Sequence, residues 1–402
     1  MRRPAVCGVL VAIAACAAPR GTTPERDPLV VLIGVDGFRA DYLERPAAAT
    51  FRSLAERGVR AEKLVPVFPT KTFPNFYTIA TGLYPTHHGI VANTMRDSVL
   101  GSFTLSNRAA VEDGRWWGGE PIWVTAIRAG HPATAMFWPG SEADVGGVRP
   151  TEWRRFTADK SYDERVEEVL GWLGRAPPER PIVTTLYFDG VDAAGHRYGP
   201  GSVEVDSAIA RVDRALASFL RGLADRGLDS IANLVVVSDH GMAELAPDRV
   251  IWIDDYLDST QAEIVDLAPV TTIAPKPGAE SAVLEALAGR HPHLAVHRAD
   301  RLPARLHADP HPRVPAIVAI ADPGWSVRRR AAGPLTDRGN HGFDPEDSSM
   351  AGILIAAGPA FRSGAVVPPL SNVHLYALLA GLLGLEPAPN DGSPDSVRAL
   401  LR

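Results

Sequence analysis

Long apolar runs along the chain predict its buried strands. The first, LVVLIGV at residues 29–35, contains β-branched residues and no polar alternation, which is typical of a strand covered on both faces. Similar runs lie at residues 182–188, 234–238, 316–320 and 352–356. Between them, apolar positions recur at helical spacing, for example from Val205 to Leu223 before Gly227. This alternation predicts an α/β fold with a mostly parallel central sheet flanked by helices.

The pattern changes between about residues 254 and 330. One short helical segment at 279–289 is flanked there by extended, proline-containing pieces, so we expect a small inserted cap subdomain. Near the C-terminus, residues 372–385 are apolar enough for a core-packed helix, with Asn372 as its expected N-cap. No long Gly/Ser-rich or charged linker divides the chain, which favours one large domain with an insertion.

The N-terminus carries an export pattern. Its sequence is MRRPAVCGVLVAIAAC, with two arginines, an apolar run and small residues before Cys16. Residues 13–16 resemble a bacterial lipobox, so we expect residues 1–15 to be a signal peptide, Cys16 to be lipidated and residues 16–28 to be a tether. The protein would then be anchored to a bacterial membrane on its periplasmic side or at the cell surface. A transmembrane anchor is the alternative, but the apolar run is shorter than the ~20 residues of a span.

The charge of the chain restricts its expected partners, and its cysteine content bears on disulfide bonds. The chain has 41 Lys+Arg and 47 Asp+Glu, and loss of Arg2 and Arg3 with the signal leaves 39 bases against 47 acids, a net of −8. This balance argues against binding a nucleic-acid polymer, and it leaves the lipid anchor as the expected membrane contact. The only other cysteine, Cys7, lies in the segment that would be removed, so no disulfide is expected.

Three of the predicted strands lead into acidic residues. Asp36 follows the run at 29–35, Asp192 lies a few residues after the run at 182–188, and Asp239 follows the run at 234–238. Ligands of open α/β sheets sit outside the carboxyl ends of the strands. These acids are therefore expected to converge although they are far apart in the sequence.

Three histidines complete a candidate metal site. His196 lies four residues after Asp192 in DAAGH, His240 follows Asp239 in SDHG, and His341 lies in the glycine-flanked loop GNHGFD. Each motif alone also fits a surface ion pair or a turn histidine. Together, three carboxylates and three imidazoles are enough ligands for two metal ions in one pocket, and the mixed oxygen and nitrogen set suits zinc.

Thr72 is the candidate nucleophile. It lies in the turn TKTFPN, where Pro74 restricts the backbone, and a nearby cation could lower the pKa of its hydroxyl. The alternative interpretation is a helix N-cap. The two roles are compatible, because a helix N-terminus also favours phosphate anions.

The combined motifs closely resemble the nucleotide pyrophosphatase/phosphodiesterase family of the alkaline phosphatase superfamily. They occur in this order: VLIGVDGFRADYL, FPTKTFPNFYTIATGLYPTHHGIVANTM, DAAGHRYGP, VSDHGM, RGNHGFDP and PAPNDG. The resemblance implies two zinc ions and an alkaline phosphatase-like fold, with residues 29–402 as the catalytic domain. One zinc ion would be bound by Asp192, His196 and His341, and the other by Asp36, Thr72, Asp239 and His240.

The resemblance also assigns roles around the phosphate. Thr72 matches the nucleophile, which forms a covalent intermediate that water later hydrolyses, and Asn93 matches the amide that binds a phosphate oxygen. The alternative for Asn93 is a turn residue before a helix. Phe73 and Tyr187 match an aromatic clamp for a nucleobase, and plain core packing is their alternative. The chain departs from the family pattern at Gly190-Val191, before Asp192, and at Phe76.

The leading hypothesis is a zinc-dependent phosphodiesterase or pyrophosphatase that releases a nucleoside monophosphate from a small nucleotide substrate. The same two-metal site could instead serve monoesters, phospholipid-type diesters or phosphonates. A third hypothesis is a lipid-anchored nucleotide- or metal-binding protein without turnover. We expect a monomer, and we expect His87, His88, His131 and His374 to be structural.

Overall fold

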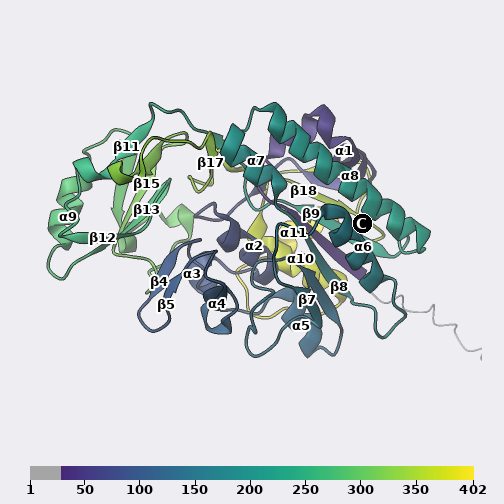
Figure 1. Ribbon diagram of the computed structural model, residues 1–402. Coiled ribbons are helices and arrows are strands. Elements are labelled where there is room, and N and C mark those ends of the chain that lie inside the picture. Colours follow the sequence, from purple (N-terminus) through teal and green to yellow (C-terminus); the bar gives the residue numbers. More distant parts are fainter. Residues whose placement is uncertain (1–28) are drawn as a thin grey trace, which may run out of the picture.

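The computed structural model describes residues 29–402, so the expected signal peptide, Cys16 and the tether lie outside the described residues. An eight-stranded sheet forms the centre of the main body (Figure 1). Its strand order is β19 (Ala365–Val367), β2 (Val59–Ala61), β18 (Leu354–Ala357), β9 (Ala232–Val237), β1 (Leu29–Val35), β8 (Val183–Phe188), β6 (Ala133–Met136) and β7 (Glu152–Arg154). All of these strands except β18 run in one direction, which confirms the predicted mostly parallel sheet.

The most apolar strands occupy the middle of this sheet. Every residue of β1 is buried, and β1 pairs in parallel with β8 on one side and β9 on the other. The apolar run at 352–356 also forms a central strand, β18, but this strand is antiparallel to β9. Burial on both faces explains the apolar composition of β18. The direction of a strand cannot be predicted from an apolar run.

Helices cover both faces of the sheet (Figure 1). One group consists of α1 (Ala49–Arg57), α6 (Tyr162–Leu173) and α8 (Val203–Asp225), and another of α2 (Thr72–Thr81), α5 (Ile122–Arg128) and α10 (Leu375–Leu383). The apolar positions predicted for α8 are its buried face, including Val205, Ile209 and Phe219. The shorter helices are α3 (Pro85–His88), α4 (Arg108–Val111), α7 (Gly190–Tyr198) and α11 (Pro394–Val397). Within residues 29–402, no helix combines the length and apolarity needed to cross a bilayer.

The expected N-cap role of Asn372 is wrong. A 3-10 turn occupies Asn372–His374, and α10 begins only at Leu375. The fully buried Asn372 side chain instead donates from Nδ2 to Oδ1 of Asn75, at 2.8 Å. A buried amide needs a buried partner, and α2 supplies one.

A second sheet lies at the left of Figure 1, away from the main body. Its antiparallel order is β12 (Ala262–Asp266), β13 (Val270–Pro275), β15 (Ile317–Ala321) and β14 (Leu294–Arg298), and α9 (Glu280–Leu287) packs against β14. The apolar run at 316–320 therefore belongs to this small sheet and not to a parallel one. Ile317 and Ala319 join a cluster that includes residues of α9, whereas Val318 packs with Phe68 of the main body. Both faces of β15 are thus covered, which explains its composition.

Short strand pairs complete the structure. They are β3 (Leu64–Val65) with β20 (Leu370–Ser371), β4 (Met95–Asp97) with β5 (Gly101–Phe103), β10 (Ala243–Glu244) with β17 (Gly339–Asn340), and β11 (Val250–Trp252) with β16 (Ser326–Arg328). The β11–β16 pair is parallel and flanks the second sheet in sequence. The two segments that connect the second sheet to the rest of the chain therefore lie side by side.

Candidate functional site

Three acidic side chains meet at the carboxyl ends of the central strands. Asp36 follows β1, Asp239 follows β9 after Ser238, and Asp192 lies in the first turn of α7, which follows β8. Gly37 makes this approach possible, because its φ is +66° and a Cβ there would lie 2.8 Å from Cα of Asp192. The Gly37 amide also donates to Oδ1 of Asp239, at 3.2 Å. The expected convergence is present in the structure.

The three candidate histidines surround these carboxylates. Nε2 of His240 lies 2.9 Å from Oδ2 of Asp239 and 3.5 Å from Oδ1 of Asp36. Oδ1 of Asp192 lies 3.4 Å from Nε2 of His196 and 3.6 Å from Nε2 of His341. All six candidate ligand residues therefore occupy one cluster.

Backbone carbonyls orient all three imidazole rings. Nδ1 of His240 donates to the Gly241 carbonyl at 2.8 Å, and Nδ1 of His341 donates to the Thr70 carbonyl at 2.8 Å. Nδ1 of His196 bonds to the carbonyl of Gly339 in β17, at 3.0 Å. A carbonyl can only accept, so each ring carries its proton on Nδ1 and directs Nε2 into the cluster. This outer support is typical of metal-binding histidines.

The carboxylates contain oxygens that lack hydrogen-bond donors. Among the described residues, Oδ1 of Asp36, Oδ1 of Asp192 and Oδ2 of Asp239 are buried without a hydrogen bond. Buried charged oxygens of this kind are costly unless a cation compensates them. The ligand atoms form two overlapping sets: Asp192, His196 and His341, and Asp36, Asp192 and His240. The residues present therefore fit metal ions, and the mixed donors are typical of zinc sites.

The protonation of the cluster follows from its burial. Burial raises the pKa of Asp36 well above its usual value, and the neighbouring charges of Asp239 and Asp192 raise it further. Burial also raises the pKa of Asp192. For His240, burial acts to lower the pKa, but the adjacent Asp239 carboxylate raises it overall. A cation bound at this cluster would oppose the burial cost and favour the ionised carboxyl groups.

Thr72 lies directly beside this cluster. It is the first residue of α2, and its Oγ1 lies 3.2 Å from Nε2 of His240. Lys71 occupies the N-cap position of α2 and makes no side-chain capping bond. The N-cap interpretation of Thr72 is therefore wrong, because Thr72 is the first residue inside the helix, and its hydroxyl lies beside a candidate metal ligand.

Asn75 holds the loop before Thr72 and was missed by sequence reasoning. Its Nδ2 donates to the carbonyls of Val67, Pro69 and Lys71 at 3.2, 3.0 and 2.9 Å, and its Oδ1 accepts from the Val67 amide at 2.8 Å. A polar residue inside the apolar α2 run was the available signal. The backbone that carries Thr72 is thereby fixed.

Thr70 joins the same loop to the His341 segment. Its Oγ1 donates to the Phe343 carbonyl at 2.9 Å and accepts from the Gly342 amide at 2.9 Å. The nucleophile candidate and the third histidine are therefore held by one buried hydrogen-bond network.

Asn93 lies next to the start of α2. Its Oδ1 accepts from the backbone amide of Phe73, at 3.0 Å. The segment after Asn93 is strand β4, so its alternative role as a turn residue before a helix is wrong. The bond to Phe73 brings the amide side chain close to Thr72.

Both candidate aromatic residues line a cleft that also includes Asp36, Thr72 and Asp192. Phe73 is half-buried and packs against Trp117, with ring centroids 5.8 Å apart. Tyr187 is buried in β8 and donates its hydroxyl to Oδ2 of Asp36.

Other cleft residues were not identified from sequence. Phe156 lies edge-on to Tyr187, with centroids 6.0 Å apart, and Arg108 contacts Glu142 at the cleft wall. They come from segments outside the recognised motifs, and no short spacing marks them.

The departures from the family pattern have local structural reasons. A Cβ at Gly190 would lie 2.4 Å from the Tyr162 hydroxyl, which accepts the Gly190 amide at 2.8 Å. Phe76 is fully buried, and its ring fills the space that a Cβ at Gly34 would need. Both positions are therefore matched to neighbouring side chains of this chain.

The four histidines expected to be structural lie outside the candidate metal site. His88 is fully buried and bonds to Thr78, whereas Nδ1 of His374 accepts from the Ser393 amide at 3.1 Å. His87 is exposed and bonds to Asp309 and Asp391, and His131 is exposed.

A family model and several known proteins match this chain. Residues 30–344 match the family model described as type I phosphodiesterase / nucleotide pyrophosphatase. The chain is 35% identical over 373 residues to human ectonucleotide pyrophosphatase/phosphodiesterase family member 5, covering 92% of this chain and 78% of the human protein. It is also 37% identical over 390 residues to a venom phosphodiesterase from Crotalus durissus collilineatus, covering 94% of this chain and 47% of the venom protein.

Solved structures show the same relationship. The structure of murine family member 5 superposes with a TM-score of 0.89 at 37% identity, covering 93% of this chain and 100% of the murine one. A second structure of that protein is an inactive threonine-to-alanine variant in complex with AMP, with the same TM-score and coverage. Bovine family member 3 is 35% identical, but the match covers only 44% of its length. The chain thus spans about half the length of several of these relatives.

Proposed function

Because the chain belongs to the type I phosphodiesterase / nucleotide pyrophosphatase family, we propose that it is a hydrolase that cleaves nucleotide phosphodiester or phosphoanhydride bonds and releases a nucleoside monophosphate. One observation carries this proposal: Oγ1 of Thr72 lies 3.2 Å from His240, at the edge of a cluster with three buried, uncompensated carboxylate oxygens. The AMP complex of the murine relative supports a small nucleotide as substrate.

We infer that the cluster holds two Zn²⁺ ions. Asp192, His196 and His341 would hold one, and Asp36, Thr72, Asp239 and His240 the other. The overlap of the two ligand sets at Asp192 supports a paired site. When bound, two zinc ions would lower the pKa of an attacking hydroxyl and neutralise charge on the phosphoryl oxygens.

Thr72 acts as the nucleophile in this proposal. Its Oγ1 attacks phosphorus as the bond to the leaving-group oxygen breaks, which leaves a phosphate ester on Thr72. Water then attacks the same phosphorus, releases the nucleoside monophosphate and restores the hydroxyl. The Asn75 contacts support this role, because they fix the backbone from which Oγ1 projects.

Asn93 and two aromatic residues would bind the substrate. The bond from the Phe73 amide occupies Oδ1 of Asn93, so Nδ2 is the end of that amide suited to a phosphate oxygen. Phe73 and Tyr187 would contact the nucleobase from opposite sides of the cleft, which they both line. The hydrogen bond to Asp36 gives Tyr187 a second role in orienting a metal ligand.

The test compares the wild type with Thr72→Ala, each stripped by chelator and reloaded with zinc. The wild type should lose activity on stripping, regain it with zinc and bind about two zinc ions per chain. The variant should bind nucleotide but lose at least about 100-fold in kcat. Near-normal turnover by the variant would contradict the assigned role.

The choice of substrate panel separates the related activities. Bis(4-nitrophenyl) phosphate and a dinucleotide should be hydrolysed much faster than 4-nitrophenyl phosphate. A preference for the monoester, a phospholipid or a phosphonate would assign the same site to another bond. Nucleotide binding by the zinc-loaded wild type without product would indicate a binding protein.

We also propose the cellular setting and organisation. Residues 1–15 would be removed and Cys16 lipidated, placing a monomeric catalytic domain of residues 29–402, with an inserted subdomain at about 254–330, on the outer side of a bacterial membrane. The names of relatives as ectoenzymes and venom proteins support an exported protein. Cys16→Ala should move the protein from the membrane to the soluble fraction, whereas retention in the membrane would support a transmembrane anchor.

A further inference from the structure

We propose that the second sheet positions the nucleophile, through an ion pair between Asp266 at the end of β12 and Lys71, the residue before Thr72. This inference rests on the proposed function of Thr72. Lys71 and Asp266 are positioning residues here, because they act on the loop and not on the substrate.

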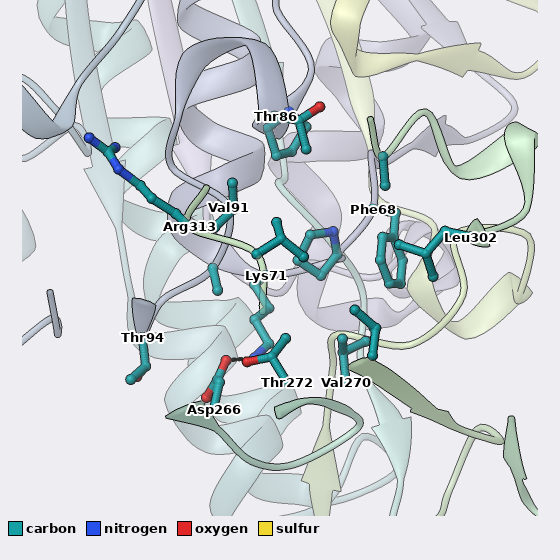
Figure 2. A pocket seen from close by; sticks show the side chains of 16 residues that line it. Phe68, Lys71, Thr86, Val91, Thr94, Asp266, Val270, Thr272, Leu302 and Arg313 are labelled. Carbon is teal, nitrogen blue, oxygen red and sulfur yellow. Dashed lines mark hydrogen bonds and ion pairs between the residues drawn. The ribbon is translucent and has the colours of Figure 1, made fainter. Parts of the chain in front are cut away.

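Backbone geometry sends the two neighbouring side chains in opposite directions. Lys71 is extended, with φ −117° and ψ 155°, whereas Thr72 begins α2, so the backbone changes conformation between the two residues. Thr72 faces His240, whereas Lys71 faces a cavity between the main body and the second sheet, where it bonds to Asp266 (Figure 2). A shift of Lys71 would therefore move the backbone of Thr72.

The ion pair is largely buried, unlike its neighbour on the same strand. The exposed fractions of the Lys71 and Asp266 side chains are 8% and 12%. Glu263, also on β12, pairs with Arg96 of β4, but their side chains are 51% and 56% exposed. Exposed pairs contribute little, whereas removing one partner of a buried pair leaves an uncompensated charge. Both ion pairs connect β12 to the main body. They differ in burial, and Lys71 is much nearer to Thr72 along the chain than Arg96 is.

A further hydrogen bond fixes each residue of the ion pair within its own segment. Oδ1 of Asp266 accepts from the Leu267 amide at 3.0 Å, which leaves Oδ2 for Lys71. The Lys71 carbonyl accepts from Asn75, as described above. A chain of hydrogen bonds therefore connects the end of β12 to the first turn of α2.

An apolar contact strengthens the same connection. Phe68 is buried in a cluster with Val270 of β13, Val318 of β15 and Leu306. Figure 2 shows Phe68, Val270 and Lys71 around one cavity, with Lys71 reaching Asp266. The nucleophile loop thus contacts the second sheet at two points, residues 68 and 71.

This arrangement predicts a specific kinetic effect. Loss of the ion pair should misplace Oγ1 of Thr72 relative to phosphorus without removing a substrate contact. Misplacement of a reacting atom by about 1 Å can cost about 100-fold in rate. The fall should therefore be in kcat, with KM nearly unchanged.

The experiment measures kcat and KM on a dinucleotide for zinc-loaded Asp266→Asn, Asp266→Glu, Lys71→Met and the double variant Asp266→Asn/Lys71→Met. Asp266→Asn keeps an oxygen acceptor for the Leu267 amide but removes the charge. We expect kcat to fall by about 10-fold or more in both single variants and no further in the double variant, with partial recovery in Asp266→Glu. Glu263→Gln, the matched control on β12, should keep wild-type kcat and KM.

Other outcomes overturn the inference. Normal kcat in Asp266→Asn, in an active wild-type background, would reject the positioning role while leaving the proposed function intact. Equal losses in Asp266→Asn and Glu263→Gln would show that the second sheet only needs to remain attached. A rise in KM without a change in kcat would make Lys71 a substrate contact. Thermal unfolding and zinc content, measured for every variant, separate these results from misfolding, and an inactive wild type would reject the proposed function itself.

Discussion

Two regions of the molecule bury acids and histidines in different ways. In the cluster at the strand ends, Asp36, Asp192 and Asp239 each keep one buried oxygen without a donor. Asp213 of α8 is also buried but is fully bonded to the start of α1: Oδ1 accepts from the amides of Thr50 and Phe51 at 2.7 and 3.1 Å, and Oδ2 accepts from the Thr50 hydroxyl at 2.7 Å. Burial alone does not identify a functional acid, whereas three buried oxygens without donors that converge with histidines in one cluster indicate a ligand site.

The histidines show the same contrast. His88, the last residue of α3, has both ring nitrogens engaged: Nε2 lies 3.1 Å from the Thr78 hydroxyl and Nδ1 accepts from the Ile90 amide at 3.1 Å. His341 uses only Nδ1 for a backbone carbonyl and directs Nε2 towards Asp192. A fully bonded histidine is a structural group, and a half-bonded one in a carboxylate cluster is a ligand candidate.

The largest effect on activity is expected at Asp192 of the candidate metal site, with the fully hydrogen-bonded Asp213 as its comparison. Asp192→Asn should lower zinc content and reduce kcat by about 1000-fold or more, because Asp192 is a proposed ligand of one zinc ion and its carboxylate also lies near Asp36 and His240. Asp213→Asn should keep zinc and kcat and lower the free energy of unfolding by about 1–3 kcal/mol through its lost helix-end contacts. Elemental analysis, diester kinetics and denaturant unfolding measure these quantities. Comparable zinc loss in both variants would break the comparison.

The paired histidine variants should differ next most strongly. His341→Gln should lower zinc affinity and reduce kcat by about 100-fold, whereas His88→Gln should leave both unchanged. Zinc titration and diester assays at saturating zinc test this. Recovery of full activity by His341→Gln at high zinc would show that the residue affects affinity alone.

In the metal-free protein, His88 should make the free energy of unfolding fall as the pH becomes acidic. Burial lowers the pKa of His88 to about 3, below the usual 6.5, so the unfolded state binds a proton between these values that the folded state does not. As pH falls from about 6 to 4, His88 should therefore remove about 1.4 kcal/mol of stability per pH unit. Urea unfolding of the wild type and His88→Gln measures the difference, and parallel pH dependences would contradict it.

The smallest effect is expected at the cleft wall. Phe73→Ala should raise KM for thymidine 5′-monophosphate 4-nitrophenyl ester by about tenfold, the loss of about 1.4 kcal/mol of stacking. Methyl 4-nitrophenyl phosphate has the same leaving group without a nucleobase and should be little affected. Equal losses on both substrates, with a lower Tm, would support the packing interpretation of Phe73.

The sequence predicted the middle four strands of the central sheet, β18, β9, β1 and β8, and the approach of the six ligand residues. Apolar runs identify strands buried on both faces, as in β1, and acids that follow such runs must lie at one sheet edge when the strands are parallel. The predictions failed where the outcome depended on partners from distant segments. Asn372 bonds to Asn75 instead of capping a helix, and the run at 316–320 lies in a separate antiparallel sheet.

Sequence by itself determined which residue types reach the strand ends, because local periodicity and motif order are written along the chain. Only the tertiary structure decided which oxygens lack donors, which way each imidazole faces and what lies behind Thr72. The Lys71–Asp266 pair joins residues 195 positions apart, and no local pattern relates them. Hydrogen bonding and burial depend on groups brought together by the whole fold, so they cannot be predicted from a segment alone.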